Sequence, residues 1–585
     1  MTKPHKFTNK EIVVLFKEVL AAMEIKEFNR FRIRAYQNLI PVLESLTMSV
    51  YNLWESNRLF EIPGVGDTIK GHLDELFKTG KVTEFDAVMH DLPQGMFSLI
   101  GLRGVGAKKA YKLAKAFELN DRKTAQQAVK EAAEKGLIKD LEGFAEKSEQ
   151  LILEALKGHK KTKSEKARTL LFRAEQVAER VLNYLEKFPE VEKVEVVGSF
   201  RRRRPTVGDI EFAIATKDPE ATTNYFLKYP EIDEVLVSGK SRSSVVIGDD
   251  IQVDTRVSDP KIFGSMVQYF TGSKVHNINL RTYTLDRGYS LSEYGIKETS
   301  TGKVHEFDNE EDFYEFLKLP WIPPEIRQGT EEIELAQKNK LPELIKLEDI
   351  KGDLHTHTIL SDGVSTLQEM VEAAREREYE YIGITDHAPS VQSRGYDEVK
   401  SIIEKTRINV AKFNAAQKDI KVLFGYEVNI LADATLSVPD DLLKELDFVI
   451  AGIHTAFDQP EEQIMKRLTY ALEHPLVDIL AHPSGRIINQ REPYAVNWQK
   501  ILKTASENNK ILEIDANPHR LDLPEDLVQQ AVKRAIPVVI NSDAHDVNQF
   551  DFMKYGIDVA KRGWCEKEHV VNTLGVDELL KYFKR

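Results

Sequence analysis

The chain has 585 residues, of which 42% are hydrophobic and 30% are charged, with a formal net charge of −13. This length predicts about three to five folding units, and this composition excludes a disordered or membrane-embedded chain. No apolar run approaches the ~20 residues of a membrane span, and the start lacks a secretory apolar core, so we expect a cytoplasmic protein without a membrane partner. The single cysteine, Cys565, excludes an intrachain disulfide and a cysteine-based zinc site.

The charge is unevenly distributed along the chain. Residues 1–300 carry a net charge of +4, whereas residues 301–585 carry −17. The first half is therefore compatible with a polyanionic partner, although the whole-chain charge argues against one.

Residues 1–160 have the apolar spacing of helices, interrupted by glycine turns. Two turns carry a Gly-x-Gly pattern at the start of a helical stretch: Gly64, Gly66, Gly104 and Gly106. Glycine lets the backbone N–H groups at a helix start approach a phosphate without a Cβ in the way. One such turn is equally typical of a plain helix connection. Two in succession, with Lys108 beside the second, favour contact with a nucleic-acid backbone.

From about residue 193 the pattern changes to short β-branched strands, and residues 243–257 predict a hairpin that turns at 248–250. Gly198 and Ser199 follow one strand and precede four arginines, a turn whose N–H groups and charge suit a phosphate. Three carboxylates lie on the neighbouring strands: Asp209, Glu211 and Asp254. Such a group suits two Mg²⁺ or Mn²⁺ ions. The alternative is a solvated arginine run beside an ordinary edge strand, which the carboxylates argue against.

Residues 260–320 return to mixed helix and loop. The next stretch, 319–350, is punctuated by proline, acidic and without a strand pattern. We expect a linker there.

Residues 350–585 alternate short apolar strands with helical stretches, which predicts a parallel α/β barrel with its function at the carboxyl ends of the strands. Histidines and carboxylates close most of these strands: His355, His357, Asp362, His387, Glu427, His454, His482, Asp543 and His545. These ligand types suit Mn²⁺, Zn²⁺ or Fe²⁺ and the bridging of metals ~3.5–4 Å apart for phosphoester hydrolysis. A lone histidine is more often structural, the role expected of His474, His519 and His569.

This ligand pattern resembles the PHP (polymerase and histidinol phosphatase) family over essentially all of residues 350–585. The resemblance implies a distorted barrel that holds up to three metal ions and hydrolyses phosphoesters. Members are small-molecule phosphatases or nucleases, and the motifs alone do not choose between these.

The strand region, in turn, resembles family X DNA polymerases, and its combination with a PHP domain resembles the bacterial PolX group. The resemblance implies that Asp209, Glu211 and Asp254 hold the catalytic metals. It implies a nucleotide site formed by Gly198, Ser199, Arg202, Gly208, Tyr269, Gly272 and Asn277. It also implies that Arg281 contacts DNA and that the two glycine turns are helix-hairpin-helix motifs.

Two positions depart from the family pattern. Glu211 stands where the family usually has aspartate, and its extra methylene must be accommodated around Mg²⁺, so polymerase activity is less secure than PHP chemistry. His72 stands where some members carry a lyase lysine, and imidazole cannot form a Schiff base. Lys70 is a weak substitute for the lyase lysine, and its position is more typical of a phosphate contact.

We therefore expect a multidomain α+β and α/β chain. Its expected parts are a helical lyase-like domain (1–85), helical fingers (86–160), a nucleotidyltransferase palm (161–260), a thumb (261–320), a linker (321–349) and the PHP barrel (350–585).

The expected function is DNA repair by a monomer that fills short gaps, acting on gapped or primer-template DNA with dNTPs. A PHP 3′–5′ exonuclease would accompany it, with abasic-site incision left open. The alternatives are a DNA-binding scaffold with an inactive palm whose only activity is the PHP nuclease, or a PHP phosphatase of small molecules.

Overall fold

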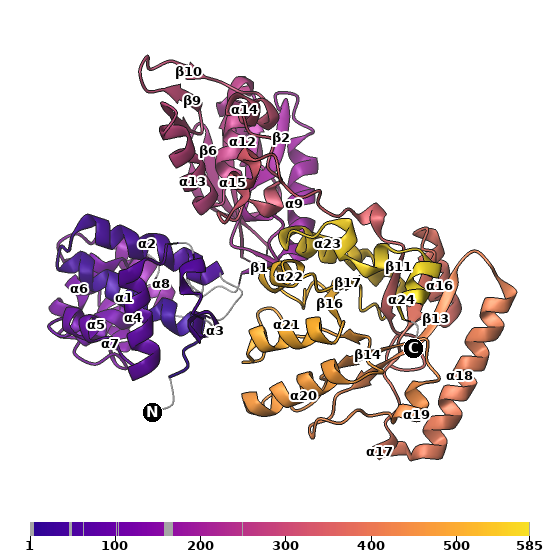
Figure 1. Cartoon of the computed structure of the whole chain (residues 1–585). Coiled ribbons are helices and arrows are strands. Elements are labelled where there is room, and N and C mark those ends of the chain that lie inside the picture. Colours follow the sequence, from indigo (N-terminus) through magenta and orange to yellow (C-terminus); the bar gives the residue numbers. More distant parts are fainter. Residues whose placement is uncertain are drawn as a thin grey trace. The chain divides into compact units, whose positions relative to one another are not determined.

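The computed structural model describes residues 5–45, 50–55, 57–62, 64–100, 102, 105–156, 168–248 and 250–583. The chain divides into two compact units, Met1–Ala167 and Arg168–Arg585, which Figure 1 colours from indigo to yellow. Within the described residues, no helix is long and apolar enough to cross a membrane.

The first unit is helical, as its sequence predicts. Its α-helices are α1 (Asn9–Ile25), α2 (Arg30–Ser45), α3 (Val50–Glu55), α4 (Asp67–Thr79), α5 (Thr83–Met89), α6 (Ala107–Ala116), α7 (Ala125–Glu134) and α8 (Glu146–Leu156), with 3₁₀ turns η1 (Leu59–Glu61) and η2 (Gln94–Leu99). Helix α1 begins with a capping box, because the Thr8 hydroxyl accepts from the Glu11 N–H while the Glu11 carboxylate accepts from the Thr8 N–H. The apolar faces meet in a shared core that includes Phe16 and Phe85.

The second unit begins with a five-stranded palm sheet in the order β2-β4-β7-β6-β5. Its strands are β2 (Lys193–Val197), β4 (Ile210–Ala215), β5 (Ile232–Ser238), β6 (Arg242–Ile247) and β7 (Ile251–Ser258). Only β4 and β7 pair in parallel. The predicted hairpin is confirmed as β6–β7, with Asp249 of its turn outside the described residues. A separate pair joins β1 (Thr169–Leu170) to β3 (Thr206–Val207).

Helices and the thumb complete this part of the chain. Four helices accompany the palm sheet: α9 (Leu171–Leu185), α10 (Gly198–Arg201), α11 (Pro219–Phe226) and α12 (Phe263–Thr271), with the 3₁₀ turn η3 (Pro260–Ile262) before α12. The thumb contains α13 (Lys274–Leu285), β8 (Tyr289–Ser292), β9 (Gly295–Glu298), β10 (Val304–His305) and α14 (Glu310–Phe316). Helix α12 packs through Met266 and Val267 on the Ala213 side of the palm sheet.

The stretch 321–349 is not the free linker that the sequence predicts. It forms η4 (Pro324–Ile326), α15 (Glu332–Gln337) and η5 (Leu347–Asp349). Ile322, Ile326 and Ile333 are buried in the thumb core. The prolines break the periodicity on which the prediction relied, but the isoleucines still bury their apolar surface.

The predicted parallel barrel is confirmed. Seven parallel strands follow one another in sequence order: β11 (Gly352–Thr356), β12 (Tyr381–Ile384), β13 (Lys421–Asn429), β14 (Phe448–Gly452), β15 (Ile479–Leu480), β16 (Ile511–Asp515) and β17 (Val538–Asn541). A parallel bridge between Thr356 and Ala544 brings the last strand back to the first.

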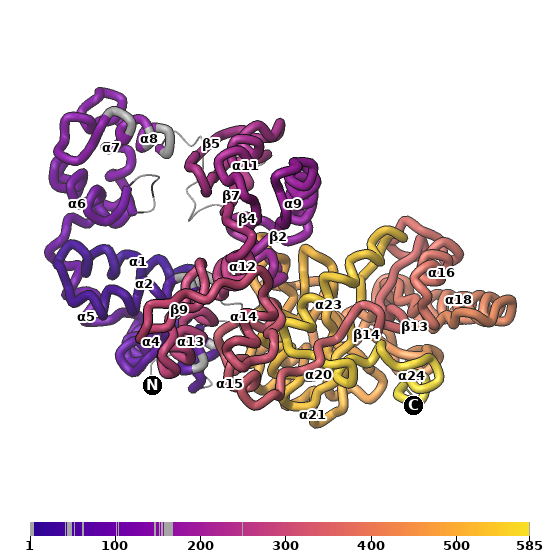
Figure 2. Tube along the Cα trace, turned by 90° about the horizontal axis from the view of Figure 1, so that it is seen from above, coloured from indigo at the N-terminus to yellow at the C-terminus, as the bar shows by residue number. Residues whose placement is uncertain are grey.

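Helices connect the barrel strands. They are α16 (Leu367–Glu376), α17 (Val391–Arg394), α18 (Tyr396–Ala416), α19 (Asp440–Leu443), α20 (Glu461–Glu473), α21 (Trp498–Glu507), α22 (Glu525–Val532), α23 (Met553–Arg562) and α24 (Val576–Tyr582), with 3₁₀ turns η6 (Val547–Phe552), η7 (Lys567–His569) and η8 (Val571–Thr573). In both views, α18 lies at the outer edge of the barrel (Figure 1 and Figure 2). The strands are buried on both faces, as expected of a parallel sheet covered by helices.

Candidate functional site

The structure brings together all nine barrel residues singled out in the sequence. His355, His357, Asp362, His387, Glu427, His454, His482, Asp543 and His545 lie in or just after strands at the carboxyl edge of the barrel. Ligand atoms gather in three groups: His357, Asp362, His387 and His545; His355, His357 and Asp543; and His387, Glu427 and His454. Each group has its ligand atoms within 4.8 Å of one another.

Glu427 lies at the centre of this cluster. Its Oε1 lies 2.7 Å from His454 Nε2 and 2.8 Å from His482 Nε2. His482, which belongs to none of the three groups, is thereby connected to them. Its Oε2 lies 2.9 Å from His387 Nδ1. One buried carboxylate thus faces histidines from three different strand ends, the arrangement expected of a bridging ligand.

Two ring nitrogens test whether these residues fit a metal ion. His355 Nε2 and His357 Nε2 are buried, and neither has a hydrogen-bond partner among the described residues. Both nevertheless face Asp543 Oδ1, at 3.5 Å and 3.2 Å. Buried polar groups are almost always satisfied. Lone pairs converging without hydrogen-bond geometry therefore fit a divalent cation.

Glu513 was not predicted from the sequence. Its Oε1 lies 2.7 Å from His355 Nδ1 and its Oε2 accepts the His482 N–H at 2.7 Å. A carboxylate on the far ring nitrogen fixes the tautomer that leaves Nε2 available to a metal. The available signal was an acidic residue between Leu512 and Ile514, inside a strand whose other acidic residue, Asp515, is its last.

Arg520 and Asp515 also lie at this edge and were not predicted. Arg520 Nε lies 3.5 Å from Asp515 Oδ2 and 3.9 Å from Asp543 Oδ2. Burial and the neighbouring Asp543 carboxylate raise the pKa of Asp515 well above its ordinary value, and Arg520 opposes this rise. The guanidinium places a positive charge beside the carboxylates, where a substrate phosphate would need one.

The palm carboxylates also lie together. Glu211 on β4 and Asp254 on β7 are register partners in the parallel pair, and Asp209 immediately precedes β4. Asp254 Oδ1 accepts hydrogen bonds from the Ser244 hydroxyl at 2.5 Å and from Gln252 Nε2 at 2.8 Å. Burial, followed by the charges of Asp209 and Asp254, raises the pKa of Glu211 to about 7. Crowded carboxylates of this kind are stabilised by divalent cations.

The predicted phosphate turn adjoins these carboxylates. Gly198 has φ +67°, a conformation that strains other residues, and a Cβ there would force the Glu211 carboxylate to move. Ser199 lies on α10, and Gly208 immediately precedes Asp209. The half-buried Arg202 guanidinium donates to the Thr271 carbonyl, and a Cβ on Gly272 would approach this guanidinium to 3.2 Å.

The predicted nucleotide wall is ordered by its own contacts. Asn277 Nδ2 donates to the Tyr269 carbonyl at 2.7 Å, and the Tyr269 and Phe270 rings meet edge to face at 5.2 Å. Arg281 is exposed on α13. Asn277 is therefore bonded to the backbone of Tyr269, and Arg202 to the backbone of Thr271, two residues further along the chain.

In the helical unit, the two glycine turns precede helices as predicted. Gly66 caps α4 and Gly106 caps α6, and a Cβ at either would meet no described atom within 4 Å. Gly64 has φ +91°, and Lys108 is exposed beside the second turn. Gly104 lies outside the described residues. The open approach fits contact between these helix starts and a phosphate backbone.

His72 lies in a hydrogen-bonded network instead of an open lyase site. Its Nδ1 lies 2.7 Å from the Tyr36 hydroxyl and its Nε2 lies 2.9 Å from Glu84 Oε2. His72 is largely buried, and Arg32 pairs with the same Glu84. The ring therefore connects three helices, which supports a structural role.

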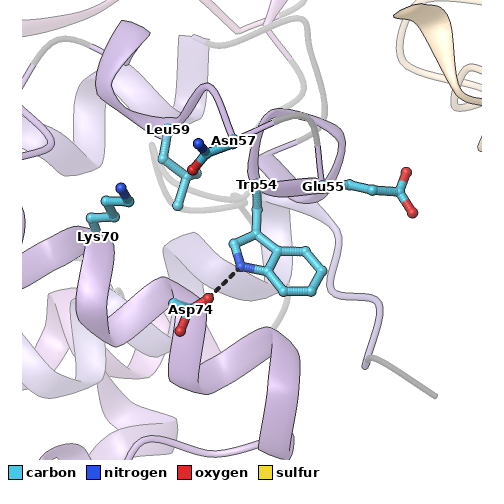
Figure 3. Close-up of a pocket in the computed structure, with 6 residues that line it drawn as sticks. All are labelled: Trp54, Glu55, Asn57, Leu59, Lys70 and Asp74. Carbon is cyan, nitrogen blue, oxygen red and sulfur yellow. Dashed lines mark hydrogen bonds between the residues drawn. The ribbon is translucent and has the colours of Figure 1, made fainter. Parts of the chain in front are cut away.

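Lys70 lines a separate cleft of about 320 Å³ with Trp54 and Asp74 (Figure 3). The Trp54 indole N–H donates to Asp74 Oδ1 at 2.9 Å. The Lys70 amine lies 4.2 Å from the centre of the Phe60 ring, a cation–π contact.

Comparison with known proteins agrees with this geometry. Three family profiles match: a helix-hairpin-helix domain over residues 7–82, a DNA polymerase beta thumb over 266–328 and a PHP domain over 353–517. A DNA polymerase/3′-5′ exonuclease PolX of Bacillus subtilis is 35% identical over 578 residues, covering 98% of this chain and 99% of that protein. The chain belongs to the PolX family.

Shorter relatives resemble only part of the chain. Probable phosphatases of Thermoanaerobacter sp. and Acetivibrio thermocellus are each 29% identical over 40% of this chain, covering 94% and 95% of their own lengths. The full-length match is thus to a two-activity PolX protein, whereas the phosphatase matches cover less than half of the chain.

Proposed function

We propose that this PolX family member fills short gaps in DNA with its palm and removes 3′-terminal nucleotides with its barrel. The observation that carries the proposal is the coexistence of two separate carboxylate sites in one chain. One joins three carboxylates to a glycine phosphate turn, and the other joins nine histidine and acidic side chains around two buried ring nitrogens that have no hydrogen-bond partner among the described residues. Full-length similarity to a polymerase/exonuclease supports it.

In the barrel, the nine predicted residues would hold up to three ions of Mn²⁺, Zn²⁺ or Fe²⁺. Such ions activate water and stabilise the leaving oxygen in phosphoester hydrolysis. Glu513 would hold His355 in the ligating tautomer, and Arg520 would bind the substrate phosphate beside Asp543. These ligand types bind several divalent metals, so a metal analysis of the purified protein identifies the ions.

In the palm, Asp209, Glu211 and Asp254 would hold Mg²⁺ or Mn²⁺. These ions would lower the pKa of the 3′-hydroxyl and stabilise the negative charge on the leaving group. Gly198, Ser199, Arg202 and Gly208 would surround the triphosphate, with Tyr269, Gly272 and Asn277 along the sugar and base of the nucleotide.

The helical unit would grip the DNA backbone without reading its sequence. Gly64, Gly66, Gly104 and Gly106 would present helix-start N–H groups to phosphates, with Lys108 nearby and Arg281 on the thumb. We propose gapped or primer-template DNA and dNTPs as substrates, and a monomeric cytoplasmic chain.

Glu211 supports one alternative, a DNA-binding scaffold with an inactive palm. With its pKa raised to about 7 by burial and two neighbouring carboxylates, Glu211 is partly protonated at neutral pH, which opposes metal binding. A small-molecule phosphatase has the support of the shorter relatives alone.

A single assay tests these readings. A primer-template with a one-nucleotide gap is incubated in Mg²⁺ or Mn²⁺, with and without dNTPs, using the unaltered chain, Asp209→Ala and His355→Ala. Loss of extension only in Asp209→Ala, and loss of shortening only in His355→Ala, would support two working sites. Shortening without extension in either metal would favour the scaffold. Faster turnover of histidinol phosphate than of a DNA 3′ end would favour the phosphatase.

A further inference from the structure

Helix α23 of the barrel presents one polar face to the palm. Tyr555 donates its hydroxyl to Glu175 Oε2 of α9 at 2.6 Å, and Lys554 Nζ lies 3.0 Å from the same oxygen. Asp558 and Arg562 continue this face, because residues four apart on a helix lie one turn above each other.

The arginine run after the phosphate turn meets this face. Arg203 Nε lies 2.7 Å from Asp558 Oδ2, and its Nη2 lies 2.6 Å from Glu175 Oε1. The three side chains are no more than about a fifth exposed. Arg203 therefore joins the barrel to the palm. The arginine run 201–204 is thus not a fully solvated surface, and not all of its arginines are available to bind phosphate.

Arg562 makes the most direct contact with the residues that follow the phosphate turn. Its Nη1 donates to the backbone carbonyl of Arg202 at 2.7 Å, and its Nη2 lies 2.9 Å from Glu525 Oε1. Arg562 is 2% exposed. Arg202 is the residue expected to bind the triphosphate, so a barrel side chain holds the backbone on which this binding depends.

The opposite face of α23 is fixed to the barrel. Gly556 packs so closely on Ile540 and Ala516 that a Cβ would lie 2.8 Å from the Ala516 Cβ. Gly556 lies about half a turn around the helix from Asp558 and about a third of a turn from Arg562. Ile540 lies on β17, the strand that leads into Asp543.

We propose that Arg562 and Asp558 are positioning residues for the polymerase nucleotide site, supplied by the PHP barrel. The proposal rests on the proposed polymerase function. Arg562 holds the Arg202 carbonyl, and Asp558 holds Arg203 in place beside it. The palm thus depends on the barrel fold for nucleotide binding, independently of the barrel's own hydrolysis.

The test uses the full-length chain and three variants: Arg562→Gln, Arg562→Lys and Arg377→Gln. Arg377 is the control, because its ion pair with Asp551 joins two residues of the barrel domain at its surface. The readouts are the Kd of a non-hydrolysable dNTP, the KM and kcat of gap filling, and the rate of 3′ shortening.

We expect Arg562→Gln to raise the nucleotide Kd and KM about tenfold, which corresponds to about 1.4 kcal/mol. The kcat at saturating nucleotide and the shortening rate should change by less than about twofold. Arg562→Lys should recover part of the affinity, because the ammonium keeps the charge opposite Glu525 and one donor. Arg377→Gln should match the unaltered chain in every readout.

A second set keeps the proposal falsifiable if Arg562→Gln does not fold. Arg203→Gln, Asp558→Asn and the double variant form a cycle in which the double should weaken nucleotide binding no more than the worse single. Additive effects, or a nucleotide Kd unchanged in both Arg562 variants, would overturn the proposal.

The same measurements separate this inference from the proposed function. If the unaltered chain binds dNTP but does not extend a primer, the gap-filling function fails while the Kd values still test the positioning residues. If it shows no metal-dependent nucleotide binding at all, both are overturned.

Discussion

The buried carboxylate of Glu310 gives a quantitative prediction about the thumb. Its Oε1 lies 2.5 Å from Arg327 Nη1, and its Oε2 accepts the Trp321 indole N–H at 2.8 Å and lies 3.0 Å from Arg201 Nη1. Burial alone would raise the pKa of Glu310, but the charge of Arg327, its hydrogen bond and the charge of Arg201 lower it to about 2. Arg201 ends α10, which begins at Gly198, so this cluster contacts the proposed phosphate turn.

The substitution Glu310→Gln removes the charge while keeping the size of the side chain. Lowering the pKa from 4.5 to about 2 corresponds to about 3 kcal/mol of folding free energy. Leaving the fully buried Arg327 unpaired leads to a similar cost of about 3–5 kcal/mol. We therefore expect Glu310→Gln to lower the local free energy of unfolding by about 3 kcal/mol at pH 7.

The pH dependence follows from the sign of the shift. Because the folded-state pKa lies below the unfolded one, the stabilisation is complete well above pH 4.5 and is lost as the pH falls toward 2. The cost of Glu310→Gln should therefore shrink to about 2 kcal/mol at pH 3.5.

Hydrogen exchange of peptides spanning 310–327 in increasing urea measures the free energy of opening at each pH. Glu315→Gln, on the exposed face of the same helix, is the control and should cost less than about 0.5 kcal/mol. A cost of Glu310→Gln below about 1 kcal/mol at pH 7, or one that is equal at pH 7 and pH 3.5, would refute the argument.

Three further predictions concern the metal sites. Glu513→Gln should weaken Mn²⁺ binding and slow shortening about 10- to 100-fold through the lost His355 contact, whereas unchanged Mn²⁺ affinity by calorimetry would speak against it. Added Mn²⁺ should raise the melting temperature of the unaltered chain more than that of His357→Ala, because metal binding favours the folded state; equal shifts would count against the barrel site. The Mg²⁺ concentration for half-maximal extension should fall as the pH rises through about 7, where Glu211 loses its proton. Glu211→Asp should move this fall to lower pH. The same pH dependence in Glu211→Asp and the unaltered chain would exclude Glu211 as the titrating group.

The gathering of histidines and carboxylates at the barrel edge could be predicted from the sequence because its signals are local. His355 lies near the end of one strand and His357 just after it, and Asp543 and His545 closely follow another strand, so strand geometry placed them at one edge. Glu513 could not be recognised in the same way. Its contact with His355 spans 158 positions, and one acidic residue inside a strand does not reveal which side chain it meets.

The arginine run shows the same limit in the palm. Its position after Gly198 indicated phosphate binding, but nothing nearby showed that Arg203 would turn to Asp558, 355 positions later. The three-stranded thumb sheet β8–β10 was also missed, because strands of two to four residues leave too short a pattern to recognise.

The position of α23, far beyond the palm strands in the sequence, has a consequence for biosynthesis. Translation completes the palm strands and the Arg202 turn long before residues 553–562 are made. Asp558 therefore becomes available to Arg203 only after the ribosome has added 355 further residues. A prematurely terminated chain that lacks α23 would carry every palm carboxylate and yet lack the contacts of Arg202 and Arg203 with Arg562 and Asp558.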